Sequence, residues 1–111
     1  GGVVKSGGEN VSTTYVSSLL MEIFSDEFED VLTVGVPDPY WGTKIVSLVR
    51  RKPGKDLRPA KALREACKGT MAEYEIPRDF LEWEGQWPMT AEGKMDLKRL
   101  QREAEERLPA A

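Results

Sequence analysis

The stretch VLTVGVPDPYWGTKIVSLV, residues 31–49, decides the fold. Its two ends, residues 31–36 and 45–49, are short, rich in β-branched side chains and almost continuously apolar, which is typical of strands covered on both faces. Two prolines and a glycine in residues 37–42 predict a loop between them. We therefore expect two strands inside the domain, with other elements packed on both of their faces.

Segments on either side of this stretch have helical spacing. From Ser12 onward, apolar residues follow an i, i+3, i+4, i+7 pattern up to Phe24, and Ser12 or Thr13 is suited to cap the helix. A second helix is expected from Pro59, because proline is tolerated in a first helical turn, to Ile76, where the next proline ends it.

Three further segments complete the predicted fold. Residues 80–83 predict a third strand, and residues 95–108 predict a charged terminal helix. The adjacent Gly7 and Gly8 are a common hairpin connection. The sequence therefore predicts an α+β fold, with a small mixed three-stranded sheet, helices packed on it and a short N-terminal hairpin before it.

Composition bounds the class of protein. The chain has 111 residues, 40% of them hydrophobic and 32% charged, and its formal charge is −3. These values are typical of one globular domain and disfavour a nucleic-acid binder that works by positive charge. The sequence has no apolar run long enough for a membrane span and no leader pattern, which predicts a cytoplasmic protein. The single Cys67 allows no internal disulfide, as expected in a reducing compartment.

The chain contains no histidine. This excludes Ser-His-Asp and Cys-His nucleophile pairs, imidazole ligands for zinc and an imidazole acid or base. Any chemistry must use lysine, arginine, carboxylate or backbone amide groups. The acidic residues between positions 26 and 30 have no His or Cys companion, so no metal site is expected. The basic residues 50–52 are interpreted as a solvated sheet edge, with an anion site as the alternative.

The first candidate site is the polar segment Lys5-Ser6-Gly7-Gly8-Glu9-Asn10, ahead of the first helix. Adjacent glycines adopt positive φ without strain, and because they carry no Cβ they let backbone amides approach a ligand closely. The alternative is a plain hairpin turn. The local sequence leaves both interpretations open.

The second candidate is PMTAEGK, residues 88–94. It is not a Walker phosphate loop, because Pro88 stands where that motif needs glycine and Met95 stands where it needs Ser or Thr. Lys94, between Gly93 and the terminal helix, carries a compact ammonium that can reach a phosphate oxygen. The alternative is an ordinary surface lysine.

Four segments, in this order, resemble the C-terminal domain of the adenylate-forming enzymes: acyl-CoA synthetases, adenylation domains of peptide synthetases, and luciferases. Residues 5–11 are similar to the glycine loop after the family's hinge, 34–42 to its VGVPD…WG stretch, 74–78 to its YKVPR segment, and 88–94 to its P-x-T-x-x-G-K motif. The resemblance covers nearly the whole chain. It implies that residues 1–111 are a single mobile C-terminal domain of a larger enzyme, which fits an opening GGVV without methionine.

The resemblance also implies a two-step ligase reaction. A carboxylate attacks ATP to give an acyl-adenylate and pyrophosphate, and a thiol, usually that of CoA, then displaces AMP. It implies that Lys94 is catalytic in the first step, near the acyl carboxylate and the α-phosphate. It implies that the glycine loop lines the pantetheine tunnel during the second step. The cofactor-binding residues on this resemblance are Lys5, Ser6, Gly7, Gly8, Glu9 and Gly93.

On this resemblance the cofactors are Mg-bound ATP and CoA in the full-length enzyme, with none bound tightly by this domain alone. The implied partners are the N-terminal domain of the same enzyme and a carboxylic acid, with no nucleic acid and no membrane span. Two alternatives remain at this level. One is an adenylation domain that loads a carrier protein, and the other is a stand-alone binding or regulatory module that kept the fold without catalysis.

Overall fold

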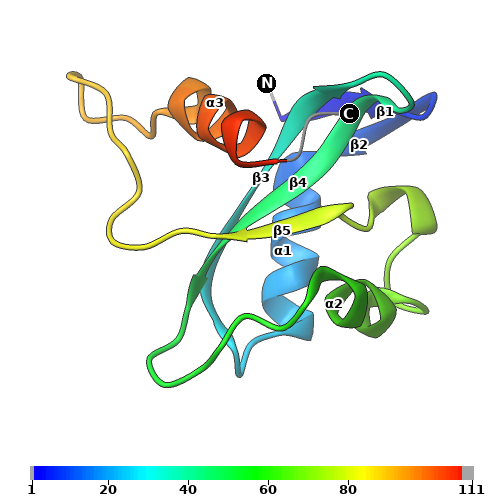
Figure 1. The fold of residues 1–111 in the computed structure, drawn as a ribbon, viewed down its shortest axis with the longest axis horizontal. Helices are drawn as coiled ribbons and strands as arrows, with labels where there is room; N and C mark the ends of the chain where they lie inside the picture. The colour runs from blue at the N-terminus through cyan, green and yellow to red at the C-terminus, as the bar shows by residue number, and fades with distance from the viewer. Residues whose placement is uncertain (1, 109–111) are drawn as a thin grey trace.

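The computed structural model describes residues 2–108 and has the predicted α+β architecture (Figure 1). In chain order its elements are β1 (Val3–Ser6), β2 (Glu9–Ser12), α1 (Thr13–Ile23), β3 (Phe28–Asp38), β4 (Gly42–Arg51), α2 (Ala60–Cys67), the 3₁₀ turn η1 (Glu73–Glu75), β5 (Asp79–Glu82) and α3 (Leu97–Arg107). The hairpin β1–β2 precedes the three-stranded sheet, as the sequence predicts. No helix within residues 2–108 has the length and apolar character needed to cross a membrane.

The sheet is mixed, with β4 between β3 and β5. β3 and β4 run antiparallel, with Val31 opposite Val49. β5 runs parallel to β4, with Val46 opposite Asp79. Because parallel neighbours need a crossover rather than a hairpin, the chain passes through α2 and η1 between β4 and β5.

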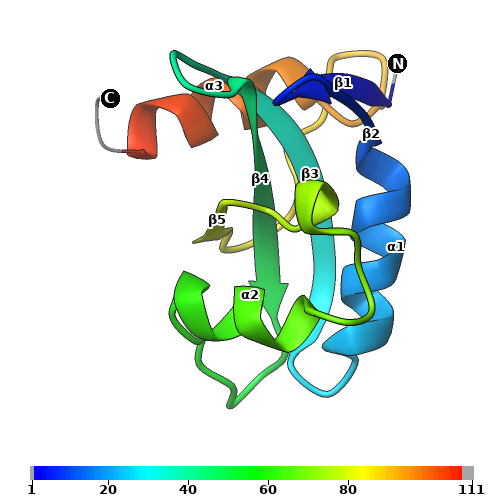
Figure 2. The ribbon, with the colours of Figure 1, turned by 90° about the vertical axis from the view of Figure 1, so that its right-hand side faces the viewer.

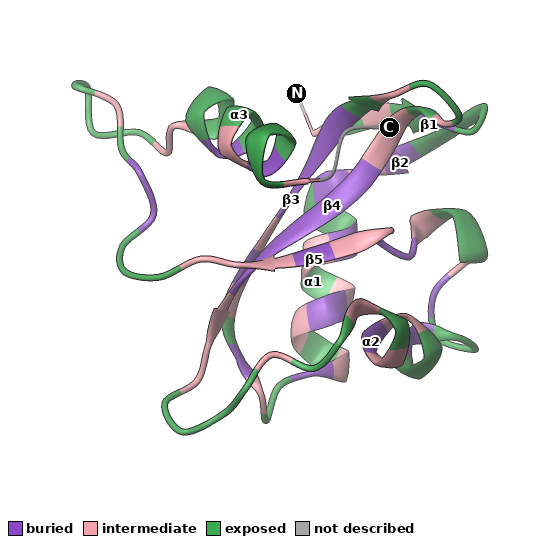
Figure 3. Cartoon of the chain, viewed as in Figure 1, coloured by how far each residue is buried: buried purple, intermediate pink, exposed green. Residues whose placement is uncertain are grey.

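Both faces of β4, the central strand, are buried, as its apolar composition predicts (Figure 3). Successive side chains of a strand point to opposite faces. Ile45 and Val49 pack in a cluster with α1 and α2, whereas Val46 and Leu48 pack in a second cluster with α3. The sheet therefore separates two apolar layers, and Figure 2 shows α1 and α3 on different sides of β3 and β4.

The cap of α1 is as predicted. The Ser12 hydroxyl accepts a hydrogen bond from the Tyr15 N–H at 3.2 Å, which satisfies one of the unpaired amides of the first turn. The terminal helix begins later than its spacing predicts, at Leu97 rather than Met95, because Asp96 provides the cap by accepting from the Arg99 N–H at 3.1 Å.

Half of the predicted loop over residues 37–42 is strand. β3 continues through Pro37 and Asp38, and β4 begins at Gly42, so only residues 39–41 connect them. The Asp38 side chain accepts from the N–H groups of Tyr40 and Trp41, and Gly42 has φ +77°, the left-handed conformation that commonly closes a three-residue hairpin loop. Pro37 is tolerated because β3 is an edge strand, where a missing N–H breaks no ladder bond on its outer side.

The second predicted helix is too long. α2 ends at Cys67, and Gly69, with φ +87°, turns the chain out of the helical path. Met71 and Ile76 still pack in the core, but from an irregular segment that contains η1. Their apolar character was therefore a sign of burial and not of a continuing helix.

Candidate functional site

The glycine loop, residues 5–9, is the tip of the β1–β2 hairpin. Gly7 and Gly8 have φ of +56° and +84°, and Ser6 lies opposite Glu9. Two successive positive φ angles are those of a type I′ turn, which requires residues such as glycine. Ser6 is buried, whereas Lys5, Gly7, Gly8 and Glu9 are exposed. The hairpin interpretation is thus confirmed, and the turn leaves its two glycines at the surface.

The two glycines differ in their surroundings. The Gly7 N–H donates to the Trp41 carbonyl oxygen at 2.9 Å, and a Cβ on Gly7 would lie 2.9 Å from Cε3 of the Trp41 ring. A Cβ on Gly8 would have no heavy atom within 4 Å. Gly7 is therefore needed for close packing, whereas Gly8 leaves open space above the turn.

The Trp41 ring contacts both Gly7 of the glycine loop and the guanidinium of Arg78. The Arg78 guanidinium carbon lies 4.0 Å from the centroid of the Trp41 ring, and the exposed Tyr40 ring meets Trp41 edge-on at 4.8 Å. Burial lowers the pKa of Arg78, and the nearby positive charge of Arg64 lowers it further. Next to Arg78, the Lys44 ammonium pairs with the Asp79 carboxylate at 3.0 Å.

The sequence did not predict that the Arg78 guanidinium packs on the Trp41 ring. Trp41 lies in a segment for which the sequence predicts only a loop, and its ring packs on Gly7. Arg78 was only the last residue of the segment 74–78, which resembles the family's YKVPR segment. It reaches Trp41 because its N–H donates to the Ile45 carbonyl at 2.8 Å, at the start of the β4–β5 pairing. No local spacing signals such a long-range register.

The second predicted site is a tight loop ahead of α3. The Thr90 N–H donates to the Lys94 carbonyl at 2.7 Å, and the Lys94 N–H donates back to Thr90 Oγ1 at 3.2 Å. Gly93 has φ +84° and donates its N–H to the Thr90 carbonyl at 3.0 Å. Lys94 and Gly93 are both exposed. The loop thus has a fixed backbone and presents a lysine to solvent.

The Lys94 ammonium is available to an outside group. Within residues 2–108, the ion pairs formed by lysines are Lys44–Asp79 and Lys68–Glu65, and none involves Lys94. An exposed lysine without a carboxylate partner can pair directly with an incoming anion.

The two candidate sites lie far apart. In Figure 1, drawn with the longest axis horizontal, the β1–β2 tip is at the right end and the loop before α3 is at the left end. The molecule extends 33 Å along that axis. The structure therefore groups Lys5–Glu9 with Trp41 and Arg78, and keeps Gly93 and Lys94 on the other side of the sheet.

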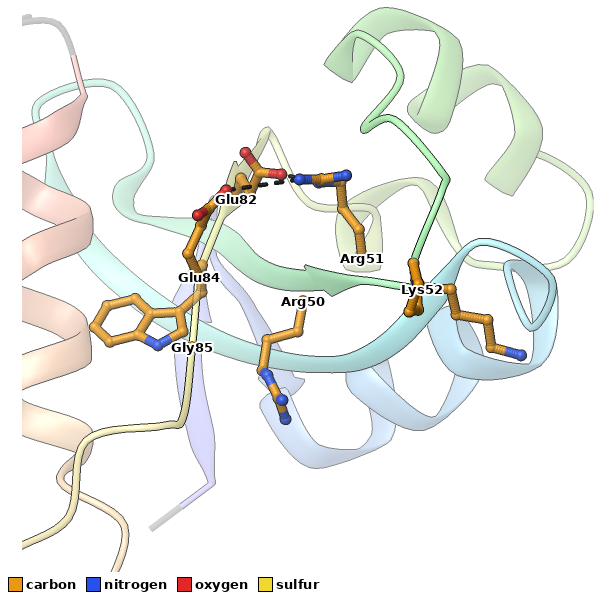
Figure 4. Close-up of a pocket in the computed structure, with 8 residues that line it drawn as sticks. Arg50, Arg51, Lys52, Glu82, Glu84 and Gly85 are labelled. Carbon is orange, nitrogen blue, oxygen red and sulfur yellow. Dashed lines mark hydrogen bonds and ion pairs between the residues drawn. The ribbon is translucent and has the colours of Figure 1, made fainter.

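The basic residues 50–52 line a pocket of about 230 Å³ (Figure 4). Arg51 pairs with Glu82 and, at 3.6 Å, with Glu84, and Figure 4 shows Arg50 and Lys52 pointing away from that pair. Arg50 lies 5.8 Å above the Trp87 ring instead. Residues 50–52 lie at the end of β4, which is the central strand, so they do not lie on a sheet edge as predicted. Carboxylates already neutralise Arg51, which disfavours the alternative of an anion site.

Two of the acidic residues near position 30 have structural partners. Glu27 forms a two-bond pair with Arg58, at 2.8 and 2.9 Å. Asp30 accepts from the Trp87 indole N–H at 2.7 Å and from the Val31 N–H at 2.8 Å. These contacts give the carboxylates a role in holding the loops around the sheet.

Comparison with known proteins identifies the family of the chain. Residues 25–94 match the model of the family described as "AMP-binding enzyme C-terminal domain". The chain is 34% identical to the putative acyl-CoA synthetase YngI of Bacillus subtilis over 94 residues, which is 85% of this chain and 16% of that protein. It is 33% identical to the mitochondrial malonate–CoA ligase ACSF3 of Bos taurus over 101 residues, 91% of this chain and 17% of that protein.

Solved structures agree in fold. A Brucella canis acyl-CoA synthetase superposes with a TM-score of 0.79 at 26% identity, over 96% of this chain and 20% of that one. The apo MatB structure from Rhodopseudomonas palustris gives a TM-score of 0.81 at 20% identity, over 95% of this chain and 20% of that one, which shows the shared fold.

This chain spans less than a fifth of the length of the curated relatives named above. The family match covers most of its residues and includes the 74–78 segment, Gly93 and Lys94. The chain therefore belongs to the AMP-binding enzyme C-terminal domain family, whose relatives here are acyl-CoA ligases.

Proposed function

We propose that this chain is the mobile C-terminal lid domain of an AMP-forming acyl-CoA synthetase, which serves both half-reactions from two different faces. The observation that carries the proposal is the separation of the exposed Lys94, which forms no ion pair within residues 2–108, from the glycine loop: the loop before α3 and the tip of the β1–β2 hairpin lie at opposite ends of the domain (Figure 1). Rotation of the domain would bring first one site and then the other to the N-terminal domain. The names of the relatives, which are CoA ligases, favour CoA over a carrier protein as acceptor.

Lys94 would act in the adenylate-forming step. Its ammonium would lie near the acyl carboxylate and the α-phosphate, where negative charge grows in the transition state. A preorganised cation at that point lowers the barrier because it needs no reorganisation when the charge develops. The unpaired state of Lys94 and the fixed backbone of its loop both suit this role.

Gly7 and Gly8 would act in the thioester-forming step. The open space over Gly8 fits the close approach of a narrow chain such as pantetheine, and Gly7 holds the turn against Trp41. The exposed ammonium of Lys5 at the same tip would help to hold the domain in this orientation. Here the chain provides a wall and a docking contact, and the thiol itself carries out the attack.

The ATP and acid pockets would lie in the preceding domain, so we expect the isolated chain to be inactive. Of the two curated relatives named above, one is named for malonate and the other for acyl groups in general. The cytoplasmic location stays a prediction, since one relative is named as mitochondrial.

The test replaces Lys94 by alanine in the full-length enzyme and measures each half-reaction. We expect acid-dependent pyrophosphate exchange to fall on the order of 100-fold, since removal of one preorganised transition-state partner has effects of that size. Thioester formation from preformed acyl-adenylate should change little. The matched control is Lys61→Ala, an exposed lysine on α2, which should leave both rates unchanged. Equal loss of both rates in Lys94→Ala, or no loss, would contradict the proposal.

A further inference from the structure

We propose that Thr90 is a positioning residue for Lys94, and that its hydroxyl sets the rate of the adenylate-forming step without touching a substrate. This inference rests on the proposed role of Lys94. It concerns the way in which a lysine on a surface loop is held accurately enough to act in a transition state.

The loop fixes the backbone of Lys94 through one residue, Thr90. Thr90 accepts from the Lys94 N–H with its hydroxyl at 3.2 Å and donates its own N–H to the Lys94 carbonyl at 2.7 Å. Its carbonyl accepts the Gly93 N–H at 3.0 Å. Both peptide groups next to the Lys94 Cα are therefore tied to Thr90, and one of these ties is a side-chain contact that a substitution can remove.

The base of the loop ties Thr90 to the core. Met89 and Met95 form an antiparallel bridge, and the Asp96 N–H donates to the carbonyl of the buried Pro88 at 2.8 Å. Asp96 also caps α3, which is anchored through the fully buried Leu100. A continuous set of contacts thus runs from the sheet through α3 to the backbone of Lys94.

The need for such anchoring follows from the lysine itself. Its side chain is exposed and has no ion-pair partner within residues 2–108, so nothing described in the chain directs the ammonium except the backbone from which it extends. A misplacement of about 1 Å at a reacting centre costs about 100-fold in rate. Thr90 is only partly exposed and its hydroxyl already accepts from the Lys94 N–H, so on this proposal it acts through Lys94.

The experiment compares Thr90→Val, which keeps the shape and removes the hydroxyl, with Thr90→Ser, which keeps the hydroxyl. Both are made in the full-length enzyme with and without Lys94→Ala. The readouts are kcat and KM of pyrophosphate exchange, thioester formation from preformed acyl-adenylate, and the melting temperature. A single lost hydrogen bond of this type corresponds to a change of about 10-fold.

We expect Thr90→Val to lower kcat of exchange about 10-fold, with KM and the thioester-forming rate within about twofold of wild type. Thr90→Ser should restore most of the rate. In the Lys94→Ala background, Thr90→Val should cause no further loss, because a residue that acts only through Lys94 has nothing left to position.

Three results would overturn the inference. If Thr90→Val leaves the rate of pyrophosphate exchange unchanged while Lys94→Ala lowers it, Thr90 has no positioning role and the proposed function stands. Thr90→Ser as slow as Thr90→Val, or a parallel fall of both half-reactions with the melting temperature, would indicate a structural role. If Thr90→Val does not fold, Thr90→Ala replaces it in the comparison with Thr90→Ser. Full activity of Lys94→Ala would instead reject the proposed function itself.

Discussion

Gly7 lies against the indole ring of Trp41 so closely that a single added carbon would collide with it. The hypothetical Cβ is 2.9 Å from Cε3 of the ring, and the backbone of the same two residues is joined by a 2.9 Å hydrogen bond. Trp41 in turn lies next to the Arg78 guanidinium. The tip of the hairpin is therefore locked to the turn between β3 and β4, although it belongs to a separate two-stranded sheet.

This packing distinguishes the two glycines. We expect Gly8→Ala to lower the free energy of unfolding by about 1 kcal/mol, because its φ of +84° strains any side chain. Gly7→Ala has the same type of strain and adds the collision with Trp41, for a total of about 2–3 kcal/mol. Urea denaturation of the chain gives both values. The cost of Gly7→Ala should shrink in a Trp41→Ala background, and equal costs in both backgrounds would contradict the proposed collision.

Cys67 should lower the free energy of unfolding at alkaline pH. Burial raises the pKa of its thiol from 9.0 to about 11, although the Arg64 charge opposes the shift. Between these values the unfolded chain loses the thiol proton and the folded chain keeps it. The free energy of unfolding should therefore fall by up to about 1.4 kcal/mol per pH unit from pH 9 toward 11.

The control for this pH effect is Cys67→Ala, which cannot titrate. Its stability is lower at every pH because of the small cavity, but the part of the slope due to the thiol should be absent. Urea titrations at pH 8, 9 and 10 measure both slopes. Identical slopes in the two proteins would show that the thiol is not shielded as the packing of α2 implies.

Two leucines on α3 provide a matched test of its anchoring. Leu100 is fully buried against the sheet, and Leu97, one turn earlier, is 55% exposed. Leu100→Ala should cost about 2–5 kcal/mol, and Leu97→Ala about 0.5 kcal/mol or less. Thermal and urea unfolding check the difference. A small cost for Leu100→Ala would mean that α3, and with it the loop of Lys94, is not fixed to the sheet.

Trp87 links the segment before that loop to β3. Its indole N–H donates to the Asp30 carboxylate at 2.7 Å, and the ring is almost buried. Trp87→Phe keeps an aromatic ring but leaves the carboxylate without this donor, and we expect a loss of about 1–3 kcal/mol. Asp30→Asn retains an acceptor oxygen and should cost less, as judged by the same urea midpoints. The opposite order would show that the hydrogen bond contributes little.

The parts of the fold that depend on local sequence were predictable. The apolar strands, the Ser12 cap and the Gly7-Gly8 turn are each set by neighbouring residues, and the structure confirms them. The end of α2 was missed because Met71 and Ile76 are apolar for a reason unrelated to helical spacing. A buried irregular segment and a buried helix both require apolar residues, so the two are difficult to distinguish from the sequence.

The candidate site was predictable in a different way. The positions of Gly7 and Lys94 came from the resemblance of ordered segments. The contact of Arg78 with Trp41 did not, because it depends on which residues of β4 and β5 are aligned. Thr90 was part of a resembling motif, but its bond to Lys94 is visible only when the loop is folded. Long-range register and loop closure are the physical information that single-sequence patterns lack.

The distance between the glycine loop and Lys94 has a kinetic consequence. They lie at opposite ends of the domain, so a reaction centre beside one loop is out of reach of the other. On the proposed function, each turnover would need the whole domain to swing out and back through the surrounding water. Friction with the solvent would then enter the turnover time. A viscous additive such as glycerol would slow the complete reaction more than either half-reaction measured by itself.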